Sequence, residues 1–317
     1  MSTTLPVPPA SACREEHANW LELQAFRDSG GIFSLQNLIN ALRIAGSSDA
    51  LEEVESEEIQ EGSDSDRIQS IAEDAFGEVE ERFRACGAEQ GSYPFNIEEQ
   101  LIRLKPKPER SIYTFLLLLS YFGEKEGLNK IKATKLFEDI CAKAAESYLG
   151  GKNDYVHSIV FGFPRRIKPK GFRKALDRVC QEMGEGACHR ERPITKDNKD
   201  AGLDVVAWRD FTDQRQGKLI AFGQCATGRN WKEKETELQP DDFCRLWVQD
   251  PLTVKPIKMF FVPHRVESIQ WTATCMQAGI LFDRCRIASL AVKTMNKDLI
   301  RQCAQWSKYV IKEELKL

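Results

Sequence analysis

The stretch DAGLDVVAWRDFTDQRQGKLIAFGQCATGRNWKEK, residues 200–234, decides the fold of the second half of the chain. It contains two short apolar runs, LDVVAWRDF and KLIAFGQCA, separated by the polar segment TDQRQG, and this pattern predicts two strands joined by a turn. Each run also carries one polar residue, Asp204 or Gln224, which a strand that only fills a core does not need. If the strands pair as a hairpin, Asp204 and Gln224 lie nearly opposite each other.

Helical and strand patterns alternate around this hairpin. Apolar residues at helical spacing predict helices over residues 129–151, 170–186, 230–238, 241–250 and 296–317. Short apolar runs predict further strands within residues 157–164, 257–264 and 279–290. We therefore expect an α/β domain over residues 126–317, with a sheet buried on both faces.

The first part of the chain has a different pattern. Residues 1–18 are rich in Pro, Ser, Thr and Ala, and we expect them to be flexible. Residues 19–125 are predicted to form a helical domain, and its acidic segment, residues 47–66, is expected to be a linker or an exposed helix. The longest apolar run, residues 114–122, is too short to cross a bilayer, so we expect a buried helix and no membrane contact.

Charge and cysteine usage narrow the class of protein. Ten cysteines occur without a CxxC pair or a secretory signal, which is typical of reduced thiols in a cytoplasmic protein. The net charge of -3 combines a balance of -13 over residues 51–100 with +5 over residues 151–200. A locally basic chain can bind a polyanion such as DNA, and the alternative is that these charges only solvate helix faces.

Three segments in a fixed order carry a family resemblance. LFEDICAKAAESYLG, GLDVVAW and GKLIAFGQCATG resemble the helix and two strands of the PD-(D/E)XK nuclease superfamily, over about residues 130–265. The resemblance implies a restriction-endonuclease-like fold, with a mixed central sheet flanked by helices. It also implies a site for Mg²⁺ or Mn²⁺ formed by Glu138, Asp204 and Gln224. Oxygen ligands of this kind suit hard cations, which polarise a scissile phosphate.

The sequence departs from the family pattern at one position. The superfamily has a lysine two residues after the Glu or Gln position, where this chain has Ala226. Because the superfamily includes lysines that have moved to a nearby helix, we assign this role to Lys232, with Lys234 as the alternative. The catalytic set predicted by the resemblance is therefore Glu138, Asp204, Gln224 and Lys232.

Other interpretations of these residues remain open. Glu138 fits the solvated face of an amphipathic helix, and Gln224 fits a structural amide that bonds the backbone. Lys199 and Asp200 either belong to the site or only cap the strand. Cys225 is disfavoured as a thiol nucleophile, because no histidine lies near it in the sequence.

Two segments are predicted to contact nucleic acid. PRRIKPKGFRK, residues 164–174, gathers basic side chains that can bind phosphates, and an ordinary basic loop is the alternative. The assigned residues are Arg165, Arg166, Lys168, Lys170, Arg173 and Lys174. Arg229 and Asn230 stand at a predicted helix N-terminus, where backbone N–H groups favour an anion.

Together these features predict a metal-dependent endonuclease, a phosphodiester hydrolase acting on DNA, with RNA left open. The resemblance implies an effector of defence against phage. No GxxxxGK[ST] loop occurs, so an ATPase or helicase would be a separate protein. A sensor protein is the other partner that we consider, and cleavage of duplex DNA would suit a homodimer. One alternative is a catalytically inactive nuclease-like interaction or DNA-binding subunit. Another is a helical adaptor that docks through residues 47–66.

Overall fold

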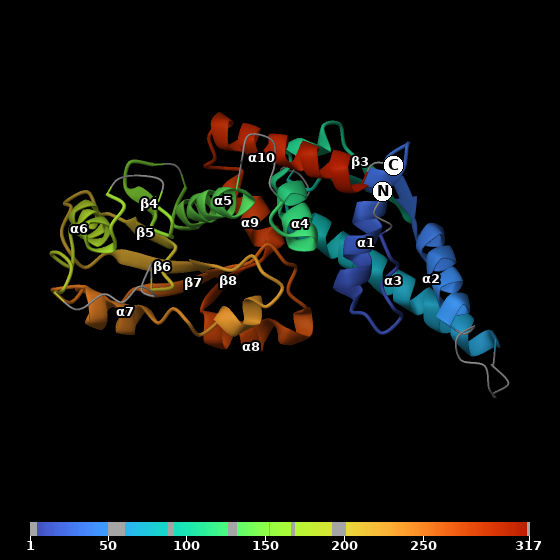
Figure 1. The fold of residues 1–317 in the computed structure, drawn as a ribbon, viewed down its shortest axis with the longest axis horizontal. Coiled ribbons are helices and arrows are strands. Elements are labelled where there is room, and N and C mark those ends of the chain that lie inside the picture. Colours follow the sequence, from blue (N-terminus) through green and yellow to red (C-terminus); the bar gives the residue numbers. More distant parts are fainter. Residues whose placement is uncertain are drawn as a thin grey trace. The chain divides into compact units, whose positions relative to one another are not determined.

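The contacts of the chain divide it into two compact units. The computed structural model describes residues 5–49, 61–87, 92–125, 132–151, 153–165, 169–191 and 201–315. One unit comprises Met1–Phe115 and Ala304–Leu317, and the other comprises Leu116–Cys303 (Figure 1). Within the described ranges, every helix is either too short or too polar to cross a membrane.

The first unit combines helices with a small sheet. Its helices are α1 (Arg14–Arg27), α2 (Leu35–Asp49), α3 (Glu61–Ala85), the short η2 (Pro108–Arg110), the first residues of α4 (Ile112–Phe122), the last residues of α10 (Lys297–Val310) and the π-helix η5 (Ile311–Leu315). Its strands are β1 (Ile32–Ser34), β2 (Phe95–Glu98) and β3 (Leu101–Leu104), which form an antiparallel sheet in the order β1-β3-β2.

This small sheet is absent from the sequence-based prediction of a purely helical domain. Glu98 pairs with Leu101, which leaves Glu99 and Gln100 as the turn, and Glu99 has a left-handed φ of 51°. The Asn-Gly or Asp-Gly pairs that predict such a turn do not occur at these positions. The start of the chain also differs from the prediction, because α1 begins at Arg14 and buries Ala18 completely.

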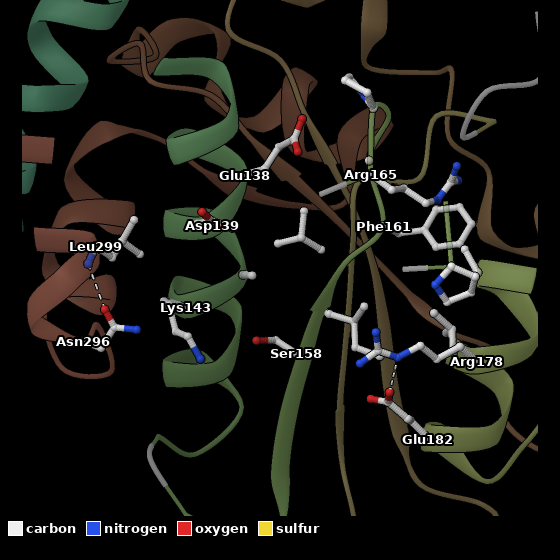
Figure 2. Close-up of a pocket in the computed structure, with 18 of the residues that line it drawn as sticks. Glu138, Asp139, Lys143, Ser158, Phe161, Arg165, Arg178, Glu182, Asn296 and Leu299 are labelled. Atoms are coloured by element: carbon white, nitrogen blue, oxygen red, sulfur yellow. Dashed lines mark hydrogen bonds and ion pairs between the residues drawn. The ribbon is translucent and has the colours of Figure 1, made fainter. Parts of the chain in front are cut away.

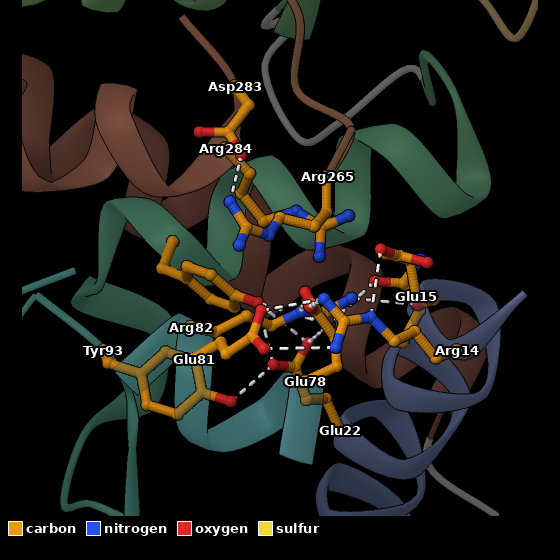
Figure 3. Close-up of polar contacts among 12 residues, drawn as sticks. Arg14, Glu15, Glu22, Glu78, Glu81, Arg82, Tyr93, Arg265, Asp283 and Arg284 are labelled. Carbon is orange, nitrogen blue, oxygen red and sulfur yellow. Dashed lines mark hydrogen bonds and ion pairs between the residues drawn. The ribbon is translucent and has the colours of Figure 1, made fainter. Parts of the chain in front are cut away.

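The first unit encloses a charged cluster, which we call the Arg82 cluster. The Arg82 guanidinium is fully buried and donates to Glu78 Oε1 at 2.8 Å and to Glu22 Oε2 at 2.9 Å (Figure 3). The hydroxyl groups of Tyr93 and Tyr113 donate to Glu22 Oε1 at 2.5 and 2.7 Å. Each charge therefore has charge-assisted partners inside the core, as a buried ion needs.

The second unit is an α/β domain built around five strands. Its strands are β4 (Val156–Val160), β5 (Val205–Arg209), β6 (Leu219–Cys225), β7 (Ile257–Phe261) and β8 (Ile280–Phe282), in the order β4-β5-β6-β7-β8. The first three strands pair antiparallel, and β7 and β8 join parallel. The further elements are α5 (Ala133–Tyr148), α6 (Phe172–Met183), η4 (Trp231–Lys234), α7 (Pro240–Trp247), α8 (Ser268–Ala278) and α9 (Arg284–Ala291).

Helices cover both faces of this mixed sheet. On one face α5 contacts β4, β5 and β6 and packs against α9. On the other face α6 and α7 bury Val206, Trp208 and Phe222, and α8 covers Phe260 and Leu281. The predicted α/β class and the predicted hairpin are confirmed. The helix predicted over residues 230–238 is reduced to the short η4, and the chain leaves the helical path before Pro240 opens α7.

Candidate metal and nucleic-acid site

Two of the predicted carboxylates converge where β4 ends and β5 begins. Glu138 lies on α5 and is 8% exposed, Asp204 directly precedes β5, and Gly162 follows β4. A Cβ atom added to Gly162 would lie 2.7 Å from Asp204 Oδ1 and 3.1 Å from Glu138 Oε2. Both carboxylates therefore flank the same bare stretch of backbone, although they are far apart in the sequence. We call Glu138 and Asp204 the carboxylate pair.

The backbone of the sheet holds Asp204 in place. Its Oδ2 accepts a hydrogen bond from the Cys225 N–H at 2.8 Å, and its own N–H donates to Gly223 O at 2.9 Å. On the other side, the Phe161 N–H donates to Asp204 O at 2.7 Å. Asp204 is thus fixed between β4 and the end of β6, and its other carboxylate oxygen, Oδ1, is the one that approaches Gly162.

A lysine that the sequence analysis missed accompanies the pair. Lys135 Nζ donates to Glu138 Oε1 at 2.6 Å and Oε2 at 2.9 Å, and to Phe163 O at 2.7 Å. Lys135 is 8% exposed and lies one helical turn before Glu138. The spacing of three residues was the available signal, because positions i and i+3 share a helix face.

Gln224 lies at the expected end of the hairpin but bonds elsewhere. The pairing of Val205 with Gly223 brings Asp204 and Gln224 to the same end. The Gln224 amide donates to Glu237 Oε2 at 2.6 Å and accepts from the Leu238 N–H at 3.3 Å. Alternation along β6 puts Gln224 on the face of Phe222, away from α5 and Glu138. The structural-amide interpretation of Gln224 therefore describes its contacts.

The lysines predicted to replace the motif lysine lie on a different segment. Lys232 is exposed on η4, with its Nζ 5.7 Å from the centre of the Trp231 ring. Lys234, on the same short helix, is half-buried. Lys135 is therefore the lysine that contacts the carboxylate pair among the residues that the structure describes.

Two thiols lie close enough to the carboxylate pair for its charges to act on them. The thiols of Cys141 on α5 and Cys225 on β6 share a hydrogen bond. Burial raises the pKa of Cys225 well above its ordinary value, and the bond to Cys141 raises this pKa further. Burial also raises the pKa of Cys141. Both thiols stay protonated near neutral pH, which agrees with the prediction that Cys225 is no nucleophile.

A pocket of about 490 Å³ adjoins the carboxylate pair. It lies along β4, between α5, α6 and the first turns of α10, and its lining includes Glu138 and Gly162. Figure 2 shows Asp139 and Lys143 on α5, Ser158 on β4, and Arg178 and Glu182 on α6 around it. The Arg178 guanidinium bonds Glu182 Oε1 at 2.5 Å, so the cation on this wall is paired with an anion.

The residues predicted to contact nucleic acid differ in their accessibility. Arg165 is 8% exposed, with its guanidinium 4.2 Å from the centre of the Phe161 ring, so its place in the core contradicts a role at the surface. Arg166 and Lys168, like Lys199 and Asp200, lie outside the described residues. The remaining residues are partly or fully exposed: Lys170, Arg173, Lys174, Arg229 and Asn230. Because η4 spans only four residues, Arg229 and Asn230 lack the helix N-terminus that we expected.

The carboxylate pair suits a hard divalent cation in part. Its donors are carboxylate oxygens, and a side chain at position 162 would fill the space that they flank. Within the described ranges, no group of three or more His, Cys, Asp or Glu side chains is arranged to hold a metal ion. The pair would therefore supply two protein ligands, and water and phosphate oxygens would supply the others, which is the usual way in which proteins hold Mg²⁺.

No protein-family model, curated protein or solved structure matches this chain. The resemblance to the PD-(D/E)XK nucleases therefore stays a prediction.

Proposed function

We propose that this chain is a metal-dependent nuclease that hydrolyses phosphodiester bonds in DNA. The observation that carries the proposal is the convergence of Glu138 and Asp204 on Gly162, next to Lys135. Carboxylates with a neighbouring lysine at the end of a sheet are the groups that such hydrolysis needs. The inferred roles in phage defence, in a homodimer and beside an ATPase or sensor rest on the family resemblance and belong to the same proposal.

Each side chain of the site has a distinct role in this proposal. Glu138 and Asp204 supply oxygen ligands, and the cation that they hold would polarise the scissile phosphate and activate water. Lys135, which neutralises Glu138 in the structure, would turn to the phosphate and stabilise the negative charge that grows on its oxygens. Asp204 can hold its orientation through this exchange, because the Cys225 N–H anchors its Oδ2.

Cleavage assays test the proposal directly. Supercoiled plasmid, linear duplex, single-stranded DNA and RNA are incubated with Mg²⁺ or Mn²⁺ and with wild type, Asp204→Asn or Lys135→Ala. We expect wild type to cut DNA and each variant to lose about 100-fold or more in rate, as when one stabilising group is removed from a transition state. Asp213→Asn, the same change in the exposed turn of the same hairpin, should cut like wild type.

Thermal melting gives a readout that does not depend on turnover. Mg²⁺ at 100 times its Kd should stabilise the wild type by about 2.7 kcal/mol, because the ion binds only the folded chain. Gly162→Ala should abolish this response, since its Cβ would meet Asp204 Oδ1 at 2.7 Å. A magnesium response that survives in both Gly162→Ala and Asp204→Asn would contradict the proposed metal site.

One observation favours the non-catalytic alternative. Gln224, which the family pattern assigns to the metal, is bonded to Glu237 and to Leu238, and Ala226 replaces the motif lysine. A nuclease-like subunit that binds DNA without cutting it would keep the fold and lose these ligands. This alternative is selected if pure wild type binds duplex DNA, cuts no substrate with either metal and gains no stability from magnesium.

A further inference from the structure

The pocket beside the carboxylate pair follows an open edge of the sheet. β4 pairs only with β5 among the described strands, so β4 is an edge strand and its other side carries no partner strand. The Phe161 N–H points inward to Asp204 O, and antiparallel strands alternate inward and outward groups. The backbone N–H and C=O of Ser158 and of Val160 therefore point outward, toward the pocket that both residues line. Nothing in the described part of the chain pairs with these outward groups.

Side chains add donors and acceptors on the opposite wall. Asn296 Oδ1 accepts from the Leu299 N–H at 2.8 Å, which leaves the Asn296 amide N–H groups as donors. Gln302 Nε2 donates to Asp298 Oδ2 at 2.7 Å, which leaves Gln302 Oε1 as an acceptor. Both amides line the pocket, so uncharged donors and acceptors occur on two walls.

The rest of the lining favours a flat, uncharged ligand. Ile159, Phe161 and Val179 give the pocket an apolar part. The cations Lys143 and Arg178 bond Glu146 and Glu182, and the third lining cation, Arg165, lies over the Phe161 ring and donates to Lys170 O. Asp139 and Asp298 add negative charge. A phosphate inside the pocket would meet these carboxylates. A nucleobase offers apolar faces with donors and acceptors at its edges, and about 490 Å³ is within the range of small-molecule sites.

From these observations we infer that the pocket binds a nucleobase, that of the nucleotide next to the scissile phosphate, turned out of the base stack. The position next to the scissile phosphate rests on the proposed function, whereas base binding by itself does not. The outward N–H and C=O of Val160 pair with the base edge, and Gln302 contacts it from α10. Because Glu138 and Gly162 belong both to the pocket rim and to the site, the phosphate of the same nucleotide reaches the carboxylate pair.

Nucleoside binding without metal tests the inference. Adenosine, cytidine, guanosine and thymidine are titrated in EDTA and followed by saturation-transfer NMR and calorimetry. We expect wild type to bind at least one of them and Ser158→Trp, whose ring fills the pocket, to bind none. Gln302→Leu, which keeps the shape and removes one hydrogen bond, should weaken binding about tenfold. Gln277→Leu on the exposed surface of α8 is the matched control and should bind like wild type.

A duplex carrying 2-aminopurine tests whether the base leaves the stack. Its fluorescence should rise when wild type binds in EDTA, and Ser158→Trp should not produce this rise. Val160→Pro removes the outward N–H without breaking a hydrogen bond to β5, and edge strands tolerate such a proline. This variant therefore still tests the inference if the tryptophan variant misfolds. Near-ultraviolet circular dichroism checks that each variant is folded.

The outcomes separate the inference from the proposed function. If the wild type cuts DNA and binds no nucleoside, and if Ser158→Trp cuts DNA at the wild-type rate, the inference is overturned and the nuclease proposal stands. If nucleosides bind and no nucleic acid is cut, base binding by the pocket is supported and the nuclease proposal fails. Asp204→Asn, which lies outside the pocket lining, should lose cleavage and keep nucleoside binding.

Discussion

The two units each bury a cluster of charged side chains, and the clusters differ in what surrounds them. In the Arg82 cluster the partners are packed protein groups: Arg82 bonds the buried Glu78 and Glu22, the half-buried Asn19 and the Glu15 carbonyl. The bonds of the carboxylate pair include those from Lys135 and from the Cys225 N–H, and the pair borders a pocket of about 490 Å³. Burial of charge is common to both clusters. An adjoining space for a ligand is what marks the second as a candidate site.

The largest expected loss of stability follows from disrupting the Arg82 cluster. Arg82→Met removes the cation and leaves Glu22 and Glu78 buried without it, which should lower the free energy of unfolding by about 3–5 kcal/mol. Arg84→Met, on the exposed side of the same helix, should change it by less than about 0.5 kcal/mol. Urea unfolding followed by circular dichroism measures both values. Equal stability of the two variants would contradict a structural role for the Arg82 cluster.

The pH dependence of the free energy of unfolding gives a smaller effect that distinguishes the two clusters. Burial raises the pKa of Tyr93 well above its usual value of 10.0, and the negative charge of Glu22 raises it further. A group whose pKa is raised on folding stabilises the folded state below its unfolded pKa, and this contribution is lost as pH rises above about 10. Tyr93→Phe should therefore flatten the alkaline loss of stability, by up to about 1.4 kcal/mol per pH unit.

The control for this experiment lies in the second unit. Asp204→Asn changes the carboxylate pair and leaves Tyr93 in place, so its stability should fall in alkali as steeply as that of the wild type. Unfolding free energies from pH 8 to pH 11 give the slopes. An identical slope for Tyr93→Phe and wild type would mean that the tyrosine does not control the alkaline response.

The smallest expected effect is that of changing Lys232, the lysine that the sequence predicted for the site. Lys232→Ala should change stability by less than about 0.5 kcal/mol and leave the cleavage rate unaltered, because Lys232 is exposed and lies over Trp231. Lys135→Ala should lower the cleavage rate about 100-fold or more, because Lys135 contacts Glu138. Parallel cleavage rates decide between the two lysines. Loss of cleavage in Lys232→Ala alone would restore the lysine predicted from the sequence.

Much of the second unit was predictable because its patterns are local. The apolar spacing that predicts a helix over residues 129–151 corresponds to α5, and the two apolar runs around the polar turn correspond to β5 and β6. The hairpin in the first unit was missed because Glu99 and Gln100 form a turn without the usual Asn or Gly. The helix expected after Asn230 was too long because local spacing did not show where the chain turns before Pro240.

The candidate site was predictable only in part. Asp204 was singled out because a carboxylate between apolar residues needs a partner, and the structure gives it the Cys225 N–H. Gln224 was grouped with it by position, although its amide bonds Glu237. Gly162 and Lys135 escaped notice, since neither residue type is unusual beside a strand or on a helix.

The sequence alone determined most of the helices and strands around the hairpin, because hydrophobic periodicity is a local property of the chain. It also determined that Asp204 and Gln224 reach the same end of the hairpin, since turn length sets the register. Only the tertiary structure decided that Glu138 and Asp204 meet at Gly162 and that Gln224 belongs to the other face of the sheet. The physical reason is that strand order and helix packing bring together residues that no local pattern connects.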